Sequence, residues 1–195
     1  MDYPGALAYL DEHINREATA GRIAGLSLEP IERLLAVLGD PQRAYPVIHV
    51  TGTNGKGSVG RMASALLAAH NLTVGTYASP HLERVNERLL WNLQPIENEP
   101  FAALIAEVAE LEPLSGVTPS YFELLTAAAL SWFAEIAVDV AVVEVGLLGR
   151  WDATNVVDAD VAVVTNIGQD HTDGVGDWRQ RIAAEKAGID RKSVV

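Results

Sequence analysis

The sequence predicts an α/β fold in which a mostly parallel β-sheet is flanked by helices. Short runs of β-branched and apolar residues alternate with longer segments of helical periodicity, which is the order found in parallel sheets with helical crossovers. The run at residues 138–145 is apolar at nearly every position, as expected for a strand covered on both faces. A glycine-rich turn at residues 52–57 separates another such run from a helical segment.

The first 45 residues are predicted to be a helical lead-in with a loop. Residues 3–15 and 28–38 both carry apolar side chains at helical spacing. Pro30 suits the first turn of the second helix, and Gly39 ends that helix. The segment between the two helices is polar, contains glycines and is expected to be a loop.

The rest of the chain alternates between strands and helices. Strands are expected at residues 47–51, 72–78, 89–91, 138–145 and 161–165. Helices are expected at residues 58–69, 99–111, 120–136 and 178–188, with a loop at 113–119. Ser120 is a predicted N-cap, because Glu123 three residues later completes a capping box. Residues 193–195 have the composition of a strand, so the sheet is expected to be incomplete where this sequence ends.

Composition excludes several classes of protein. The chain has 195 residues and a net charge of −12, whereas a general nucleic-acid-binding protein needs a basic surface. It has no cysteine, which excludes disulfides and thiolate metal sites and agrees with a cytoplasmic location. No apolar run reaches membrane-spanning length, and the N-terminus is acidic, unlike a signal peptide. We therefore expect a cytoplasmic globular protein that binds neither nucleic acid nor membranes.

The stretch VIHVTGTNGKGS at residues 47–58 predicts a phosphate-binding loop. Glycines allow consecutive backbone N–H groups to face one anion, and the following helix adds partial positive charge at its N-terminus. Lys56 would reach the outer phosphates, and Ser58 would offer its hydroxyl to phosphate or Mg²⁺. The spacing departs from the usual pattern, because only two residues separate Gly52 from Gly55 and one residue separates Lys56 from Ser58. The alternative is a glycine-rich turn that binds nothing.

Polar residues also stand at the ends of three further predicted strands, at Ser79, at Glu144 and between Thr165 and His171. The carboxyl ends of parallel strands share one edge of a sheet, which is where ligands bind. A carboxylate there, beside a phosphate loop, is suited to hold Mg²⁺. The alternatives are an ion pair between Glu144 and Arg150, a turn hydroxyl for Ser79 and a turn histidine at 171. The remaining histidines are expected to be structural: His13, His49, His70 and His81.

Six motifs follow one another along the chain: GTNGKGS at 52–58, SPHL at 79–82, YFE at 121–123, EVGLLGRWDATN at 144–155, DHTD at 170–173 and EKAGI at 185–189. Together they resemble the folylpolyglutamate synthase/dihydrofolate synthase family of the Mur ligase superfamily. The resemblance implies a P-loop NTPase-like Mur ligase central domain. Residues 1–195 would be an N-terminal ATP-binding domain, with residues 1–45 as lead-in and substrate loop. The C-terminal glutamate-ligase domain of the family would be absent.

The resemblance implies that ATP activates a carboxylate of dihydropteroate or of a folate as an acyl phosphate, which L-glutamate then attacks. ATP phosphates would bind at Thr53, Asn54, Gly55, Lys56, Gly57 and Ser58. Mg²⁺ would be held by Ser79, Glu144 and His171, and the catalytic residues would be Lys56, Glu144, His171 and Lys186. Lys186 matches a family lysine that becomes carbamylated and could then approach a second Mg²⁺. The alternative for Lys186 is an ordinary surface lysine.

The resemblance also implies a substrate surface, formed by Gly25, Leu26, Ser120, Tyr121, Phe122, Glu123, Trp151, Asp152 and Ala153. The rings of Tyr121, Phe122 and Trp151 could stack on the pterin, or they could simply pack in the interior. Two residues depart from the family pattern. Leu148 stands where the family usually has glycine, so the position of that loop and the affinity for substrate are not settled by the resemblance. Gln169 stands where the family usually has leucine, so the resemblance does not settle which groups surround His171.

Three functions follow from these observations. The first is the ATP-binding part of a folate-type ligase, whose family form would be monomeric and whose isolated part would be inactive. The second is a Mur-type ligase for peptidoglycan precursors, which would share the phosphate loop but not the SPHL, YFE and EVGLLGRWDATN motifs. The third is a fragment that only binds nucleotide or a partner chain, without turnover, and whose unpaired sheet edge favours self-association or aggregation.

Overall fold

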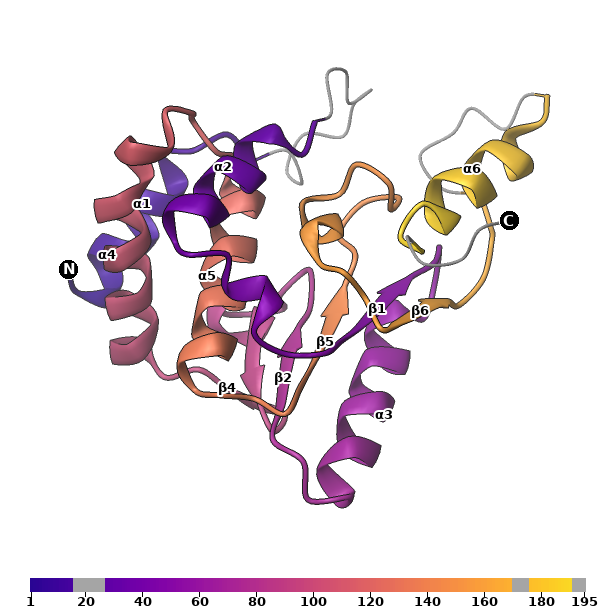
Figure 1. The fold of residues 1–195 in the computed structure, drawn as a ribbon, viewed down its shortest axis with the longest axis horizontal. Helices are drawn as coiled ribbons and strands as arrows, with labels where there is room; N and C mark the ends of the chain where they lie inside the picture. The colour runs from indigo at the N-terminus through magenta and orange to yellow at the C-terminus, as the bar shows by residue number, and fades with distance from the viewer. Residues whose placement is uncertain (16–26, 170–175, 191–195) are drawn as a thin grey trace.

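The computed structural model describes residues 1–15, 27–169 and 176–190, and it confirms the α/β architecture (Figure 1). The described residues form a six-stranded sheet in the order β4-β3-β2-β5-β1-β6. The parallel strands are β2 (Val74–Tyr77), β5 (Val140–Glu144), β1 (Val47–Thr51) and β6 (Val161–Val164). Two antiparallel strands extend the sheet beyond β2: β3 (Leu89–Trp91) and β4 (Gln94–Pro95).

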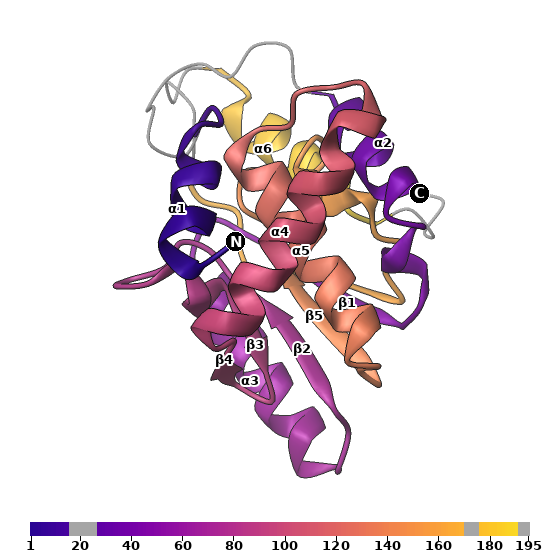
Figure 2. The same ribbon diagram turned by 90° about the vertical axis from the view of Figure 1, so that its left-hand side faces the viewer.

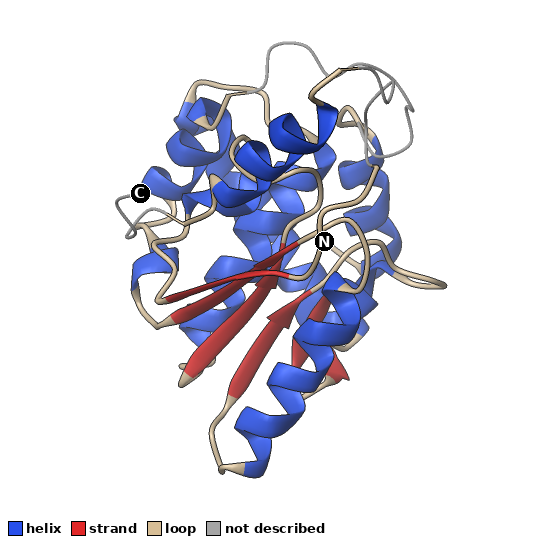
Figure 3. Ribbon diagram, turned by 90° about the vertical axis from the view of Figure 1, so that its right-hand side faces the viewer, coloured by secondary structure: helices blue, strands red, loops and turns tan. Residues whose placement is uncertain are grey.

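Helices cover both faces of the sheet, but unequally. One face carries a layer of four helices: α1 (Tyr3–Asp11), α2 (Glu29–Val37), α4 (Asn98–Ser115) and α5 (Tyr121–Glu135). Figure 2 looks onto this layer, and Figure 3 shows α3 (Lys56–Ala69) on the opposite face. The last helix, α6 (Trp178–Ala187), lies near the carboxyl ends of the strands (Figure 1). Three short 3-10 helices complete the described residues: η1 (Pro41–Arg43), η2 (Val85–Arg88) and η3 (Ala153–Val156).

Two hydrophobic clusters hold these layers together. The larger one lies between the four-helix layer and the sheet, and includes the fully buried rings of Tyr77, Phe101 and Phe133. The smaller one lies under α3 and is built on valines from three strands: Val50, Val74, Val140 and Val142. Strand β5 is buried at every position, which confirms the prediction from its apolar run. The parallel strands are thereby fixed in register, so their carboxyl ends share one edge.

The boundaries of several elements differ from those expected. The first helix ends at Asp11 instead of residue 15, and α3 begins at Lys56 instead of Ser58. Strand β2 is shorter than expected and β4 was not expected. The predicted loop at 113–119 begins only at residue 116, because α4 continues to Ser115. The predicted strand at 193–195 lies outside the described residues. In the described part of the chain, no helix is both long and apolar enough to cross a membrane.

Candidate functional site

The glycine loop connects β1 to α3, as predicted from the sequence. Gly52 has a φ of 148° and Gly55 a φ of 81°, which are backbone conformations that favour glycine. A Cβ atom at Gly52 would lie 1.8 Å from Oγ1 of Thr165, so a side chain cannot fit there without displacing the segment that follows β6. The chain can therefore turn this tightly because both positions are glycine.

The N-terminus of α3 faces the loop. Gly55 is the N-cap residue, and no side chain among the described residues caps this helix. The first N–H groups of a helix have no partner within the helix, so Lys56, Gly57 and Ser58 present donors together with the positive end of the helix dipole. The Nζ atom of Lys56 donates to the carbonyl of Gly52 at 3.1 Å, which folds this side chain back over the loop. This geometry is that of an anion-binding site.

The segment after β6 holds the glycine loop in place. The backbone N–H of Thr53 donates to the carbonyl of Asn166 at 3.1 Å, and the N–H of Asn54 donates to the Asn166 side-chain oxygen at 3.1 Å. The N–H of Gly168 donates to the Thr53 hydroxyl at 2.9 Å, and the Thr165 hydroxyl donates to the Asn54 carbonyl at 2.7 Å. Thr53 and Asn54 therefore use these groups to join two strand ends, so their part in the predicted phosphate site would be to hold the loop in shape.

Glu144 brings the ends of β5 and β2 to the same place. Its carboxylate accepts a long hydrogen bond of 3.4 Å from the backbone N–H of Ser79. It also lies against the glycine loop, because a Cβ atom added at Gly57 would be 3.4 Å from Oε2 of Glu144. Three predicted site residues that are distant in the sequence, Lys56, Ser79 and Glu144, thus gather at one edge of the sheet. Their convergence is what the positions at the strand ends predicted.

The environment of Glu144 fits a cation. The residue is 6% exposed, and burial raises the pKa of its carboxyl group above the ordinary value. The hydrogen bond from Ser79 and the charges of Lys56 and Arg61 act in the opposite direction and favour the carboxylate. The alternative of an ion pair with Arg150 is not found among the ion pairs of the described residues. A buried carboxylate is an oxygen donor of the kind Mg²⁺ prefers, and the backbone of Ser79 lies within hydrogen-bond distance of it.

The rest of the predicted metal set is not fully described. His171 lies outside the described residues, as do Gly25 and Leu26 of the predicted substrate surface. Within the described ranges no group of three or more His, Cys, Asp or Glu side chains could hold a metal ion. Gln169, which departs from the family pattern, is exposed.

Lys186 is a buried residue at the end of α6. It is 1% exposed, so the alternative of an ordinary surface lysine is wrong. The carbonyl of the preceding residue, Glu185, accepts from the N–H of Arg150 at 2.9 Å, and a Cβ atom at Gly149 would lie 2.7 Å from that carbonyl oxygen. Helix α6 therefore packs closely on the loop that follows β5, which carries the EVGLLGRWDATN motif.

The predicted substrate residues at 120–123 begin α5. Ser120 and Glu123 form the predicted capping box: the N–H of Ser120 donates to Oε2 of Glu123 at 2.6 Å, and the N–H of Glu123 donates to the Ser120 hydroxyl at 3.4 Å. Phe122 packs against the core, and its ring would be 2.6 Å from a Cβ atom at Gly146. Tyr121 is 6% exposed, and its ring lies beneath the guanidinium of Arg88, which sequence reasoning did not include in the site.

The other predicted substrate residues lie in the loop after β5. Trp151 is 46% exposed, whereas Asp152 and Ala153 are buried. The Asp152 carboxylate accepts from the N–H of Leu147 at 2.7 Å and from the N–H of Thr154 at 3.0 Å, so it holds the loop in shape. Burial raises the pKa of Asp152, while these hydrogen bonds lower it. At Leu148, where the resemblance led us to expect glycine, φ is 59°, which is the left-handed region.

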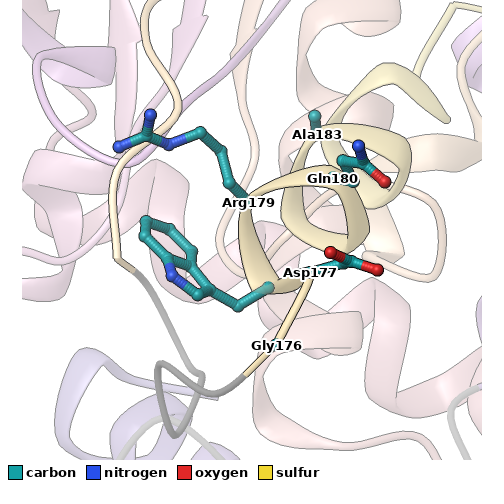
Figure 4. A pocket seen from close by; sticks show the side chains of 6 residues that line it. Gly176, Asp177, Arg179, Gln180 and Ala183 are labelled. Atoms are coloured by element: carbon teal, nitrogen blue, oxygen red, sulfur yellow. The ribbon is translucent and has the colours of Figure 1, made fainter.

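A separate hollow of about 450 Å³ lies at the start of α6 (Figure 4). Its walls are formed by Gly176, Asp177, Trp178, Arg179, Gln180 and Ala183. The guanidinium of Arg179 lies 5.3 Å from the centre of the Trp178 ring. None of the residues that gather around the glycine loop contributes to it. The hollow is therefore distinct from the candidate site.

Comparison with known proteins identifies relatives of this chain. The Mycobacterium tuberculosis dihydrofolate synthase/folylpolyglutamate synthase is 48% identical over 174 residues, which cover 84% of this chain and 36% of that protein. The Escherichia coli dihydrofolate synthase/folylpolyglutamate synthase is 47% identical over 167 residues, which cover 85% of this chain and 39% of that protein. The chain thus spans less than half the length of these relatives.

Solved structures show the same fold. The structure of M. tuberculosis folylpolyglutamate synthase complexed with ADP superposes with a TM-score of 0.85 and 41% identity, over 98% of this chain and 44% of that one. An FPGS–AMPPCP–folate complex superposes with a TM-score of 0.86 and 36% identity, over 97% of this chain and 46% of that one. The model of the Mur ligase middle domain matches residues 50–193, well over half of the sequence. The resemblance expected from the motifs is confirmed, and the chain belongs to the Mur ligase middle-domain family.

Proposed function

We propose that this chain is the ATP-binding part of a ligase that joins L-glutamate to dihydropteroate or to a folate. The observation that carries the proposal is the convergence of Lys56, Ser79 and Glu144 beside the glycine loop. The named relatives with ADP, AMPPCP and folate support the nucleotide and the acid substrate. The chain spans less than half the length of these relatives, so we propose the complete reaction only for a protein of their full length.

The chemistry requires groups that bring two anions together. An oxygen of the substrate carboxylate attacks the γ-phosphorus of ATP, and ADP leaves. The amine of L-glutamate then attacks the acyl carbon, phosphate leaves, and the nitrogen loses a proton to give an amide. In this chain the N–H groups of residues 55–58 and the Lys56 ammonium would hold the phosphates and offset the charge that develops on them.

Ser79 and Glu144, with His171, would hold Mg²⁺. This ion would supply positive charge that stabilises the transferred phosphoryl group. Lys186 is buried. If carbamylated, it would offer a carboxylate that could approach a second Mg²⁺. The pterin-bearing acid would lie near Tyr121 and Trp151, while Asp152 would act by holding the loop that carries Trp151.

The runner-up functions are less well supported. A Mur-type ligase for peptidoglycan precursors would share the fold, but the named relatives here act in folate metabolism according to their names. Release of phosphate from ATP on addition of dihydropteroate and L-glutamate would separate a ligase from a fragment that only binds nucleotide. We place the protein in the cytoplasm, where folates and ATP meet.

Nucleotide binding by the Lys56→Ala variant tests the proposal. Loss of one charge-assisted contact is expected to weaken ADP or AMPPCP binding by about 100-fold, as measured by calorimetric titration. The fold should survive, because the Lys56 side chain is only partly buried and bonds to one carbonyl. Arg43→Ala is the matched control, since it removes the same charge from a side chain that is 76% exposed. Unchanged nucleotide affinity in Lys56→Ala would refute the phosphate cradle.

A further inference from the structure

Helix α3 carries two charged side chains, Lys56 and Arg61, and both are cations in its first two turns. The helix contains no acidic residue, so Arg61 has no ion-pair partner three or four positions away. A cation in the last turn would be stabilised by the helix dipole, but that turn has none, and Arg61 in the second turn gains nothing from it. The position of Arg61 therefore has no explanation within its own helix.

The register of α3 places Arg61 between the ends of two strands. Gly57, one turn earlier on the same face, lies against β5, because a Cβ atom added there would be 3.4 Å from Oε2 of Glu144. Ser64, three residues after Arg61, shares a 2.7 Å hydrogen bond with the hydroxyl of Thr76 in β2. Arg61 therefore stands on the face of α3 that is turned toward the carboxyl ends of β5 and β2.

Helix geometry directs the Arg61 side chain toward the glycine loop. Side chains of a helix lean toward its N-terminus and cover the preceding turn, which for Arg61 is the turn of Gly57 and Ser58. The electrostatics of the edge agree with this direction. The charges of Lys56 and Arg61 both lower the pKa of the Glu144 carboxyl group, so the guanidinium lies within electrostatic range of that carboxylate. Two cations from one helix thus act on the same edge of the sheet.

The Arg61 guanidinium is not held by a carboxylate. Among the ion pairs of residues 1–15, 27–169 and 176–190, none includes Arg61, and its side chain is exposed. Lys56, in contrast, already donates to the carbonyl of Gly52. A guanidinium carries five N–H donors in one plane, which match two oxygens of a phosphate group. Arg61 can therefore turn onto an incoming phosphate without breaking an ion pair.

The side of the loop on which Arg61 stands decides which phosphate it meets. The N–H groups of residues 55–58 and the Lys56 ammonium would hold the phosphates at the end of α3. Under the proposed function, a cation at Glu144 neutralises the phosphoryl group that is transferred, so this group lies on the Glu144 side of the loop. A chain with a net charge of −12 repels a triphosphate, so a further local cation is needed there.

We propose that Arg61 binds the terminal phosphate of the nucleoside triphosphate, beside Glu144. This inference rests on the proposed ligase function, because it assigns a further residue to the same phosphate site. Arg61 then distinguishes a triphosphate from a diphosphate, whereas Lys56 contributes to the binding of both. The competing explanation is that Arg61 only favours the charged form of Glu144 and never contacts the nucleotide.

The experiment compares a triphosphate analogue with a diphosphate. The 195-residue chain is titrated calorimetrically with AMPPCP and with ADP, both in the presence of Mg²⁺. Arg61→Met is expected to weaken AMPPCP binding by about 10-fold and to leave ADP binding nearly unchanged. The fold should survive, because the Arg61 side chain is exposed and methionine is a good helix former. Arg43→Met is the matched control: it removes the same charge from a 76% exposed side chain that precedes β1, at the amino end of the strands.

The outcomes separate this inference from the proposed function. If Arg61→Met weakens AMPPCP and ADP equally, or neither, while Lys56→Ala weakens both, the phosphate cradle stands and only the inference is wrong. The titrations are repeated in a Glu144→Gln background, where a direct contact with phosphate keeps the effect of Arg61→Met on AMPPCP. An effect that disappears there means that Arg61 acts only through Glu144, which also overturns the inference. If the wild type binds neither nucleotide, the proposed function fails and the inference fails with it.

Discussion

Replacing Gly52 by alanine is expected to be far more damaging than replacing Gly55, although both glycines belong to one loop. At Gly52 a Cβ atom would lie 1.8 Å from Oγ1 of Thr165, 3.0 Å from its Cβ and 3.2 Å from the backbone nitrogen of Asn166. At Gly55 nothing lies within 4 Å of the added atom. The Gly55 variant therefore measures the free-energy cost of a positive φ alone. The Gly52 variant adds the cost of the steric clash with Thr165 and Asn166.

The magnitudes follow from these distances. At Gly55 only the left-handed backbone opposes a side chain, at about 1–2 kcal/mol, offset in part by the lower entropy of the unfolded chain. At Gly52 the clash of the added Cβ atom is expected to cost about 1–3 kcal/mol of stability, and the strained backbone about 1–3 kcal/mol more. Moving Thr165 aside would also break its 2.7 Å hydrogen bond to the carbonyl of Asn54. We expect a loss of about 1 kcal/mol for Gly55→Ala and about 3–5 kcal/mol for Gly52→Ala.

Urea denaturation followed by circular dichroism measures both losses on the same scale. Gly60→Ala is the internal control: it lies in regular helix, its added Cβ would be 3.7 Å from Val142, and it is expected to stabilise the protein by up to about 1 kcal/mol. Gly52→Ala combined with Thr165→Ala should recover part of the loss, because the nearest clashing atom is then gone. Equal stabilities for the Gly52 and Gly55 variants would refute the argument that the loop is packed against the segment after β6.

Three further predictions concern the loop after β5 and the metal edge. Glu144→Gln should weaken Mg²⁺-dependent but not Mg²⁺-free nucleotide binding. Burial raises the pKa of Glu144, so the wild type loses stability as pH rises through that pKa. The thermal midpoint of Glu144→Gln should therefore be higher than that of the wild type at pH 8 but not at pH 4.5. Leu148→Gly should raise stability in urea by about 0.5–1 kcal/mol by relieving its positive φ. Asp152→Ala should cost about 2–4 kcal/mol in urea, because donors from Leu147 and Thr154 lose their acceptor.

Local patterns were sufficient to predict most elements. The capping box of Ser120 and Glu123 forms as expected because both partners lie within one turn. The end of α4 was not predictable in this way. Pro113 lacks an N–H and normally ends a helix, yet the last turn persists: the Tyr9 hydroxyl donates to the Glu112 side chain, and the Ser115 hydroxyl donates to the Glu112 carbonyl at 2.6 Å. Tertiary contacts decide the boundary there.

The site shows the same division. Parallel strands bring their ends to one edge, so the meeting of Lys56, Ser79 and Glu144 could be inferred from strand positions alone. The bonds between the glycine loop and Asn166 link residues more than a hundred positions apart, and no periodicity encodes them. The burial of Arg88 was not predicted for a similar reason, because a charged residue before a short strand is expected to be exposed on sequence alone.

Leu148 shows how the fold compensates for a departure from the family pattern. The backbone there has the positive φ that glycine would adopt without strain, and yet the turn is kept. Its carbonyl accepts from the hydroxyl of Thr51 at 2.6 Å, and the preceding N–H, that of Leu147, donates to buried Asp152. Asp152 is itself held by Thr154, whose hydroxyl accepts from Nε2 of His49 on the neighbouring strand. A network that begins in β1 thus holds this loop in shape although residue 148 is not glycine.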